Sequence, residues 1–146
     1  MTAHGVGSAI RIEGTMDQHQ YLTILKEGLL LTIAGHRLNR EKVIFQHDND
    51  PKHKAGTVTD WLKRQPFSVL EWPAQSPYLN PIEHLWALLK KQLNGYDRAP
   101  TEMQELWERV SEQWDKIDKS ACLGLIESMP RRIQAVIKVK GGHTKY

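Results

Sequence analysis

Residues 42–53 read KVIFQHDNDPKH, and this stretch gives the clearest structural signal in the chain. It begins with a short, mostly apolar run, Lys42–Gln46, which predicts a buried strand. A polar cluster, His47–His53, follows at once and contains Asp48 and Asp50. Because ligands in open α/β sheets gather beyond the carboxyl ends of the strands, this acidic cluster is a candidate functional site.

Upstream of this strand, a glycine-containing segment precedes a helical one. Ile10 and Ile12 alternate within Gly5–Met16, which predicts a strand or a hairpin remnant. Asp17 is then a candidate N-cap for a helix whose leucines recur at helical spacing as far as about Gly35.

Downstream, helix and strand alternate again. A helical pattern ends near Gln65 and Pro66, and residues 67–72 (FSVLEW) predict a second strand. Prolines make Pro73–Pro81 an extended loop, after which Asn80 is a candidate cap for a helix with Glu83 in its first turn. The apolar stripe of that helix consists of Ile82, Leu85, Trp86, Leu89 and Leu93, and Glu83 lies off it.

The rest of the chain predicts helices over about 103–117, 122–129 and 133–139. The order of elements therefore indicates an α/β layer with a helical C-terminal part. We expect a single domain over 1–146, with a strand and helix core over about 5–95 and a helical part over about 96–146.

Composition limits the classes of protein to consider. The single cysteine, Cys122, excludes an internal disulfide framework and a cysteine-rich zinc site, and its helical neighbours predict that it is buried. The net charge is +3, and residues 130–146 contain five cations and no acid. Such a basic end is equally consistent with phosphate binding and with a solvated surface. No apolar run is long enough to span a membrane, and no secretory signal is visible, which predicts an intracellular protein.

Asp48 and Glu83 are the residues best suited to chemistry. A carboxylate after a strand and another at a helix start can meet at the end of a sheet, where they would suit Mg²⁺ or Mn²⁺. The structural alternative is that Asp48 and Asp50 shape a turn and that Glu83 stabilises the positive end of its helix. Spacing alone favours this structural alternative, because short motifs produce many false matches.

Two longer motifs resemble a known family. Residues 45–53 (FQHDNDPKH) are similar to the segment around the second catalytic Asp of mariner-superfamily transposases, and residues 72–86 (WPAQSPYLNPIEHLW) resemble the segment around their catalytic Glu. Thirty-four residues separate Asp48 from Glu83, which is the interval of one major branch of the superfamily. The similarity extends from about Gly5 to the C-terminus.

This resemblance implies a ribonuclease H-like fold and a cut-and-paste DNA transposase that cleaves DNA and transfers strands with two Mg²⁺ or Mn²⁺ ions. Asp48 and Glu83 would be the second and third catalytic acids and metal ligands. Supporting residues would be Asn49, Asp50 and His53, and the DNA-binding residues would be Lys90, Lys91, Arg131 and Arg132. The partner would be transposon-end DNA, and the location would be the nucleus.

The chain also departs from the family pattern. The family has a first catalytic Asp on an upstream opening strand, which we do not find after Met1, and it usually has Asp where this chain has Tyr78. We therefore expect a fold truncated at its N-terminus, little metal binding, no DNA movement by this chain alone, and self-association through the incomplete sheet.

Two alternatives remain open. The first is a non-enzymatic DNA-binding remnant that uses the basic C-terminal segment. The second is a transition-metal hydrolase built on His47, Asp48, His53 and His84, although this spacing matches no common zinc motif.

Overall fold

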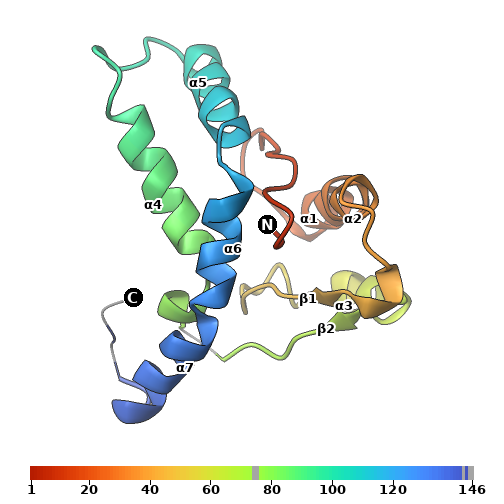
Figure 1. Cartoon of the computed structure of the whole chain (residues 1–146). Helices are drawn as coiled ribbons and strands as arrows, with labels where there is room; N and C mark the ends of the chain where they lie inside the picture. The colour runs from red at the N-terminus through yellow and green to blue at the C-terminus, as the bar shows by residue number, and fades with distance from the viewer. Residues whose placement is uncertain (74–75, 143, 145–146) are drawn as a thin grey trace. The chain divides into compact units, whose positions relative to one another are not determined.

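The structure is a computed structural model that describes residues 1–73, 76–142 and 144 (Figure 1). The chain falls into two compact units. We call Gly7–Gln75 the Asp48 unit, and Met1–Val6 together with Ser76–Tyr146 the Glu83 unit. The predicted single domain, with its division near residue 95, remains a prediction.

The Asp48 unit contains helices and a two-stranded parallel sheet. Its elements are α1 (Gln18–Ile24), the π-helical turn η1 (Leu25–Leu29), α2 (Leu30–Gly35), the 3-10 turn η2 (Arg40–Lys42), β1 (Ile44–Phe45), α3 (Gly56–Lys63) and β2 (Ser68–Val69). Ile44 is opposite Ser68 and Phe45 is opposite Val69. Because parallel strands need a crossover connection, α3 provides the link between β1 and β2.

An apolar core joins the first helical run of this unit to α3. Its buried residues are Tyr21, Leu25, Ile33, Val58, Trp61, Leu62 and Phe67. Val58, Trp61 and Leu62 line one face of α3, at the spacing of an amphipathic helix. Phe45 packs against this core from β1, so the core fixes the strand after which Asp48 follows.

The first helix confirms the predicted cap and end. Asp17 Oδ1 accepts hydrogen bonds from the backbone N–H groups of His19 and Gln20, both at 2.8 Å. The helical run then continues through η1 and ends at Gly35. The π-helical turn within this run was not predicted.

The two predicted strands are much shorter than expected. The ladder includes Ser68 N–H donating to Val43 O at 3.1 Å and Leu70 N–H donating to Phe45 O at 2.8 Å. The prediction that 42–46 is buried is wrong for Ile44, which is 67% exposed. Successive side chains of a strand point to opposite faces, so Phe45 reaches the core while Ile44 faces away from it.

The strand predicted within Gly5–Met16 does not form among the described residues. The only pairing there is an isolated bridge between Thr2 and Gly5. Ile10 instead lies against the first helical run, where a Cβ atom on Gly28 would be 2.7 Å from Ile10 Cδ1. Ile10 therefore packs on a helix, and Gly28 provides the space for its side chain.

The Glu83 unit is helical. Its elements are the 3-10 turn η3 (Pro77–Leu79), α4 (Ile82–Leu93), α5 (Met103–Asp115), α6 (Lys119–Glu127) and α7 (Met129–Lys138). Figure 1 shows α4 beside α5, with α6 and α7 following one another. The buried apolar residues of this unit are Leu85, Leu89, Trp114, Ile117 and Cys122, which confirms the prediction for Cys122. Trp86 stacks on Trp114 with ring centroids 4.9 Å apart.

The loop before α4 differs from the prediction. Ala74 and Gln75, which belong to the predicted extended loop, lie outside the described residues, and so does Lys145 of the basic end. Pro77–Leu79 forms a 3-10 turn, because the fixed φ of Pro77 suits the first position of a helical turn. Pro81 caps α4 in place of Asn80, although Asn80 Oδ1 still accepts from Ile82 N–H at 3.4 Å. None of the described helices is both long and apolar enough to cross a membrane.

Candidate metal centre and DNA contacts

Asp48 lies in the turn that follows β1, and its side chain is 59% exposed. Its Oδ1 atom accepts a hydrogen bond from Asp50 N–H at 3.1 Å. The same atom lies 2.6 Å from His53 Nδ1. Among the described residues, the hydrogen bonds to this carboxylate all reach Oδ1, which leaves Oδ2 for another ligand.

These contacts favour the ionised form of Asp48. Burial alone would raise the pKa of this carboxyl group. The hydrogen bonds from Asp50 N–H and His53 outweigh that effect, so the pKa lies below its ordinary value. An exposed, ionised carboxylate is the kind of oxygen ligand that Mg²⁺ and Mn²⁺ prefer.

Asn49 and Asp50 shape the turn around Asp48. Asn49 Nδ2 donates to Trp72 O at 2.8 Å, which ties the segment after β1 to the segment after β2. Asp50 Oδ1 accepts from Lys52 N–H at 2.9 Å, and Asp50 O accepts from His53 N–H. Asp50 therefore has the predicted structural role of shaping the turn, and this turn holds Asp48 in a defined loop.

One aromatic neighbour of the Asp48 turn, Tyr21, was missed from the sequence. The Tyr21 ring on α1 stacks on His53 with centroids 3.9 Å apart. The Tyr21 hydroxyl lies 3.4 Å from His47 Nδ1. Burial, followed by the charges of Asp48 and Asp50, raises the pKa of Tyr21. A usable signal was that Tyr21 falls on a buried helix face and that a buried tyrosine hydroxyl needs a polar partner.

Glu83 lies in the first turn of α4 and is exposed, as its position off the apolar stripe predicts. Its N–H group donates to Asn80 O at 3.2 Å. Leu85 and Leu89 on the same helix are 1% and 5% exposed, so core packing holds the helix that carries Glu83. A carboxylate at this end also interacts favourably with the helix dipole.

Asp48 and Glu83 belong to different units, and their sharing of one ion remains a prediction. Both are exposed carboxylates, so the donor type fits a hard divalent cation. The described residues contain no group of three or more His, Cys, Asp or Glu side chains that could hold a metal. The transition-metal alternative gains no support from His84, because Arg132 Nη1 lies 3.3 Å from its Nδ1 atom.

The predicted DNA contacts divide into exposed and buried cations. Lys90, Lys91 and Arg131 are exposed. Arg132 is only 2% exposed, so its predicted role as a DNA contact is wrong. Its guanidinium group is engaged inside the Glu83 unit, with Ser128, Tyr78 and His84.

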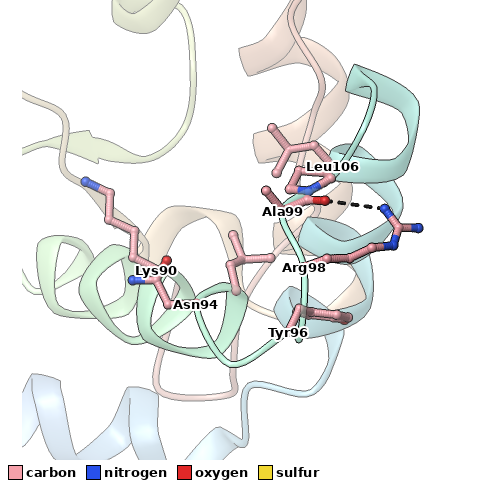
Figure 2. A pocket seen from close by; sticks show the side chains of 8 residues that line it. Lys90, Asn94, Tyr96, Arg98, Ala99 and Leu106 are labelled. Atoms are coloured by element: carbon pink, nitrogen blue, oxygen red, sulfur yellow. Dashed lines mark hydrogen bonds between the residues drawn. The ribbon is translucent and has the colours of Figure 1, made fainter.

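Lys90 lines a pocket of about 390 Å³ where α4 meets the segment leading to α5. The lining residues are Lys90, Leu93, Asn94, Tyr96, Arg98, Ala99, Pro100 and Leu106. Figure 2 shows that the Lys90 side chain extends away from Arg98. Arg98 forms an ion pair with Glu105 at 2.9 Å, whereas a DNA contact at the exposed Lys90 remains a prediction.

Comparison with known proteins identifies the family. A model of the DDE superfamily endonuclease family matches residues 7–107. The chain is 45% identical over 141 residues to the Tcb1 transposase of Caenorhabditis briggsae, a match that covers 97% of this chain and 50% of that protein. It is 40% identical over 145 residues to the Tc1 transposase of Caenorhabditis elegans, covering 99% of this chain and 52% of that protein. The chain therefore belongs to the DDE superfamily endonucleases.

Within that class, these relatives are Tc1/mariner transposases, so the predicted mariner resemblance is confirmed. The chain spans about half the length of the curated relatives that it matches. The catalytic domain of the Mos1 mariner transposase superposes with a TM-score of 0.78 at 25% identity, covering 90% of this chain and 66% of the Mos1 chain. A Mos1 paired end complex with Mg gives a TM-score of 0.87 at 25% identity, covering 98% of this chain and 42% of that chain. The predicted ribonuclease H-like α/β fold is confirmed.

Proposed function

We propose that this chain supplies two catalytic carboxylates, Asp48 and Glu83, to a cut-and-paste DNA transposase. The observation that carries the proposal is the family match over residues 7–107, which includes both acids and the motifs around them. The identity of 45% with the Tcb1 transposase over nearly the whole chain supports the same assignment. Asp17 is not a further acid of the site, because its carboxylate caps α1.

In this proposal the two carboxylates hold Mg²⁺ or Mn²⁺. Such ions activate a water molecule or a 3′-hydroxyl group and stabilise the leaving oxygen of a phosphodiester. Asp48 remains ionised through its hydrogen bonds with Asp50 and His53, so it is ready to bind a cation. Asn49 and Asp50 keep the turn in shape, and Leu85 anchors the helix that presents Glu83.

The DNA-binding part of the proposal uses the exposed cations Lys90, Lys91 and Arg131. Each would neutralise a phosphate group and release condensed counterions, so affinity for DNA should fall steeply with salt. Binding to transposon-end DNA in the nucleus follows from this activity.

The metal proposal is tested by titrating the full chain with Mn²⁺ and measuring free Mn²⁺ by electron paramagnetic resonance. We expect Asp48→Asn and Glu83→Gln each to weaken Mn²⁺ binding by about tenfold or more, since each removes a charged oxygen ligand. Asp60→Asn and Glu127→Gln remove exposed carboxylates on α3 and α6 and serve as matched controls. An equal response of all four variants would count against the proposal.

A DNA experiment separates catalysis from binding. The full chain is incubated with Mg²⁺ or Mn²⁺ and transposon-end DNA, and both binding and cleavage are followed. Salt-sensitive binding that survives Glu83→Ala, without any cleavage, would favour the non-enzymatic alternative. Cleavage that Asp48→Ala abolishes would show that this chain is catalytic by itself, contrary to the expectation from its sequence.

A further inference from the structure

Arg132 on α7 is the most completely buried charged side chain among the described residues. A buried guanidinium group is costly unless its N–H groups are hydrogen-bonded. Arg132 Nε donates to Ser128 Oγ at 2.7 Å, and Nη1 donates to Tyr78 O at 3.0 Å. Nη1 also lies 3.3 Å from His84 Nδ1. All four residues belong to the Glu83 unit.

The contacts of Nη1 lie on both sides of Glu83 in the sequence. Tyr78 is in η3, just before the turn that leads into α4, and His84 is in the first turn of α4. The local side-chain hydrogen bond at this end of the helix runs from Ile82 N–H to Asn80 Oδ1 and is long, at 3.4 Å. A single group from a distant helix therefore links the two segments that flank Glu83.

The orientation of the guanidinium group is itself fixed. Ser128 Oγ donates to Leu125 O at 2.6 Å, so its lone pairs are directed toward Arg132 Nε. Because the guanidinium is planar and its donors form a rigid fork, fixing Nε also fixes Nη1. Arginine has no acceptor, so His84 Nδ1 must accept this bond, and the ring proton of a neutral His84 lies on Nε2.

We propose that Arg132 is a positioning residue for Glu83, which it acts on through the carbonyl group of Tyr78 and the ring of His84. The effect of Arg132 on metal binding rests on the proposed function. Its positioning of the segment from Tyr78 to His84 does not rest on that function. Helix α7 thereby becomes part of the catalytic machinery without contacting the ion.

The experiment compares the full chain with Arg132→Met and Arg132→Lys, and with Lys138→Met as a charge-matched control. Lys138 is an exposed cation on the same helix. Nitrogen-15 NMR reports the tautomer of His84, and hydrogen exchange reports the amide groups of Glu83–Leu85. The same samples are then titrated with Mn²⁺.

For Arg132→Met we expect loss of the single His84 tautomer and amide exchange about tenfold faster at the start of α4. Mn²⁺ binding should weaken by about tenfold, as for other residues that orient metal ligands. Arg132→Lys should restore part of each effect, since lysine retains the charge but not the fork. Lys138→Met should change none of the three measurements.

An unchanged His84 tautomer and unchanged exchange in Arg132→Met would overturn the inference. If Arg132→Met does not fold, Arg132→Lys decides: wild-type tautomer, exchange and Mn²⁺ affinity in that variant would overturn it equally. Failure of the proposed function has a different signature, namely Mn²⁺ affinity that does not respond to Glu83→Gln while the His84 and exchange effects persist.

Discussion

The Asp48 turn and the start of the Glu83 helix are held in place by different means. The hydrogen bonds of Asp48 come from Asp50 and His53, within five positions along the chain. The start of α4 is linked instead to Arg132, 48 positions from His84 and 54 from Tyr78. A carboxylate held by its sequence neighbours can be interpreted from sequence, whereas a helix start linked to a distant helix depends on the folded unit.

The largest expected effect tests how strongly core packing anchors α4. Leu85 is 1% exposed, and Leu85→Ala should lower the free energy of unfolding by about 2–5 kcal/mol, because it removes buried methyl groups and leaves a cavity. Urea unfolding followed by tryptophan fluorescence measures this change. Lys90→Ala, at an exposed position of the same helix, should stay within about 0.5 kcal/mol of wild type. A decrease in the free energy of unfolding of less than about 1 kcal/mol for Leu85→Ala would show that core packing at Leu85 does not anchor α4.

A smaller effect is expected in the Asp48 turn. Asn49→Ala removes the hydrogen bond to Trp72 O and should cost about 1 kcal/mol, the usual net value of such a bond. Hydrogen exchange should show the loss mainly at residues 48–54, since the other bonds of the turn are local. Faster exchange spread over α1 and α3 would contradict the view that the remaining hydrogen bonds of the turn are local.

Local signals were sufficient for much of the fold. The cap at Asp17, the burial of Cys122 and the apolar anchor Leu85 were all predicted, because each depends on helical spacing or on a neighbouring backbone N–H group. The single family to which both acid motifs point was also evident from the sequence. Whether Asp48 and Glu83 bind a common ion remains a prediction.

Long-range packing explains the errors. Arg132 was predicted to contact DNA because a cation in a basic segment gives no sign of burial. Ile10 and Ile12 alternate like a strand, but the space above Gly28 that receives Ile10 is a property of the folded helix. Tyr21 was missed because its stacking on His53 joins residues far apart in sequence.

The Glu83 unit also contains local contacts. The pH dependence of stability tests one of them, the set of hydrogen bonds to Glu105. The N–H group of Thr101 is the largest cause that lowers the pKa of Glu105 from 4.5 to about 2, followed by the Thr101 hydroxyl and the arginines Arg98 and Arg109. The stabilisation is therefore complete above about pH 4.5 and is lost as the pH falls toward about 2. Thermal unfolding of Glu105→Gln should depend less on pH in this range than that of wild type. Parallel pH profiles for the two proteins would exclude this contribution.

The smallest effect on stability, with the clearest effect on association, is expected at β1. Among the residues described, β1 pairs with β2 alone, and Ile44 is 67% exposed. We propose that this sheet edge mediates self-association, which a charge would oppose. Ile44→Lys should keep the free energy of unfolding within about 0.5 kcal/mol and reduce association in analytical ultracentrifugation. A monomeric wild-type chain at high concentration would remove the basis for this expectation.

The central proposal is that Asp48, in the turn after β1, and Glu83, in the first turn of α4, serve one metal site. Crystals of the chain grown with Mn²⁺, and measured at the manganese absorption edge, test it directly. Anomalous density bound by the carboxylates of both Asp48 and Glu83 is the predicted result. Manganese bound elsewhere, or at one of these carboxylates with the other turned away, would contradict it.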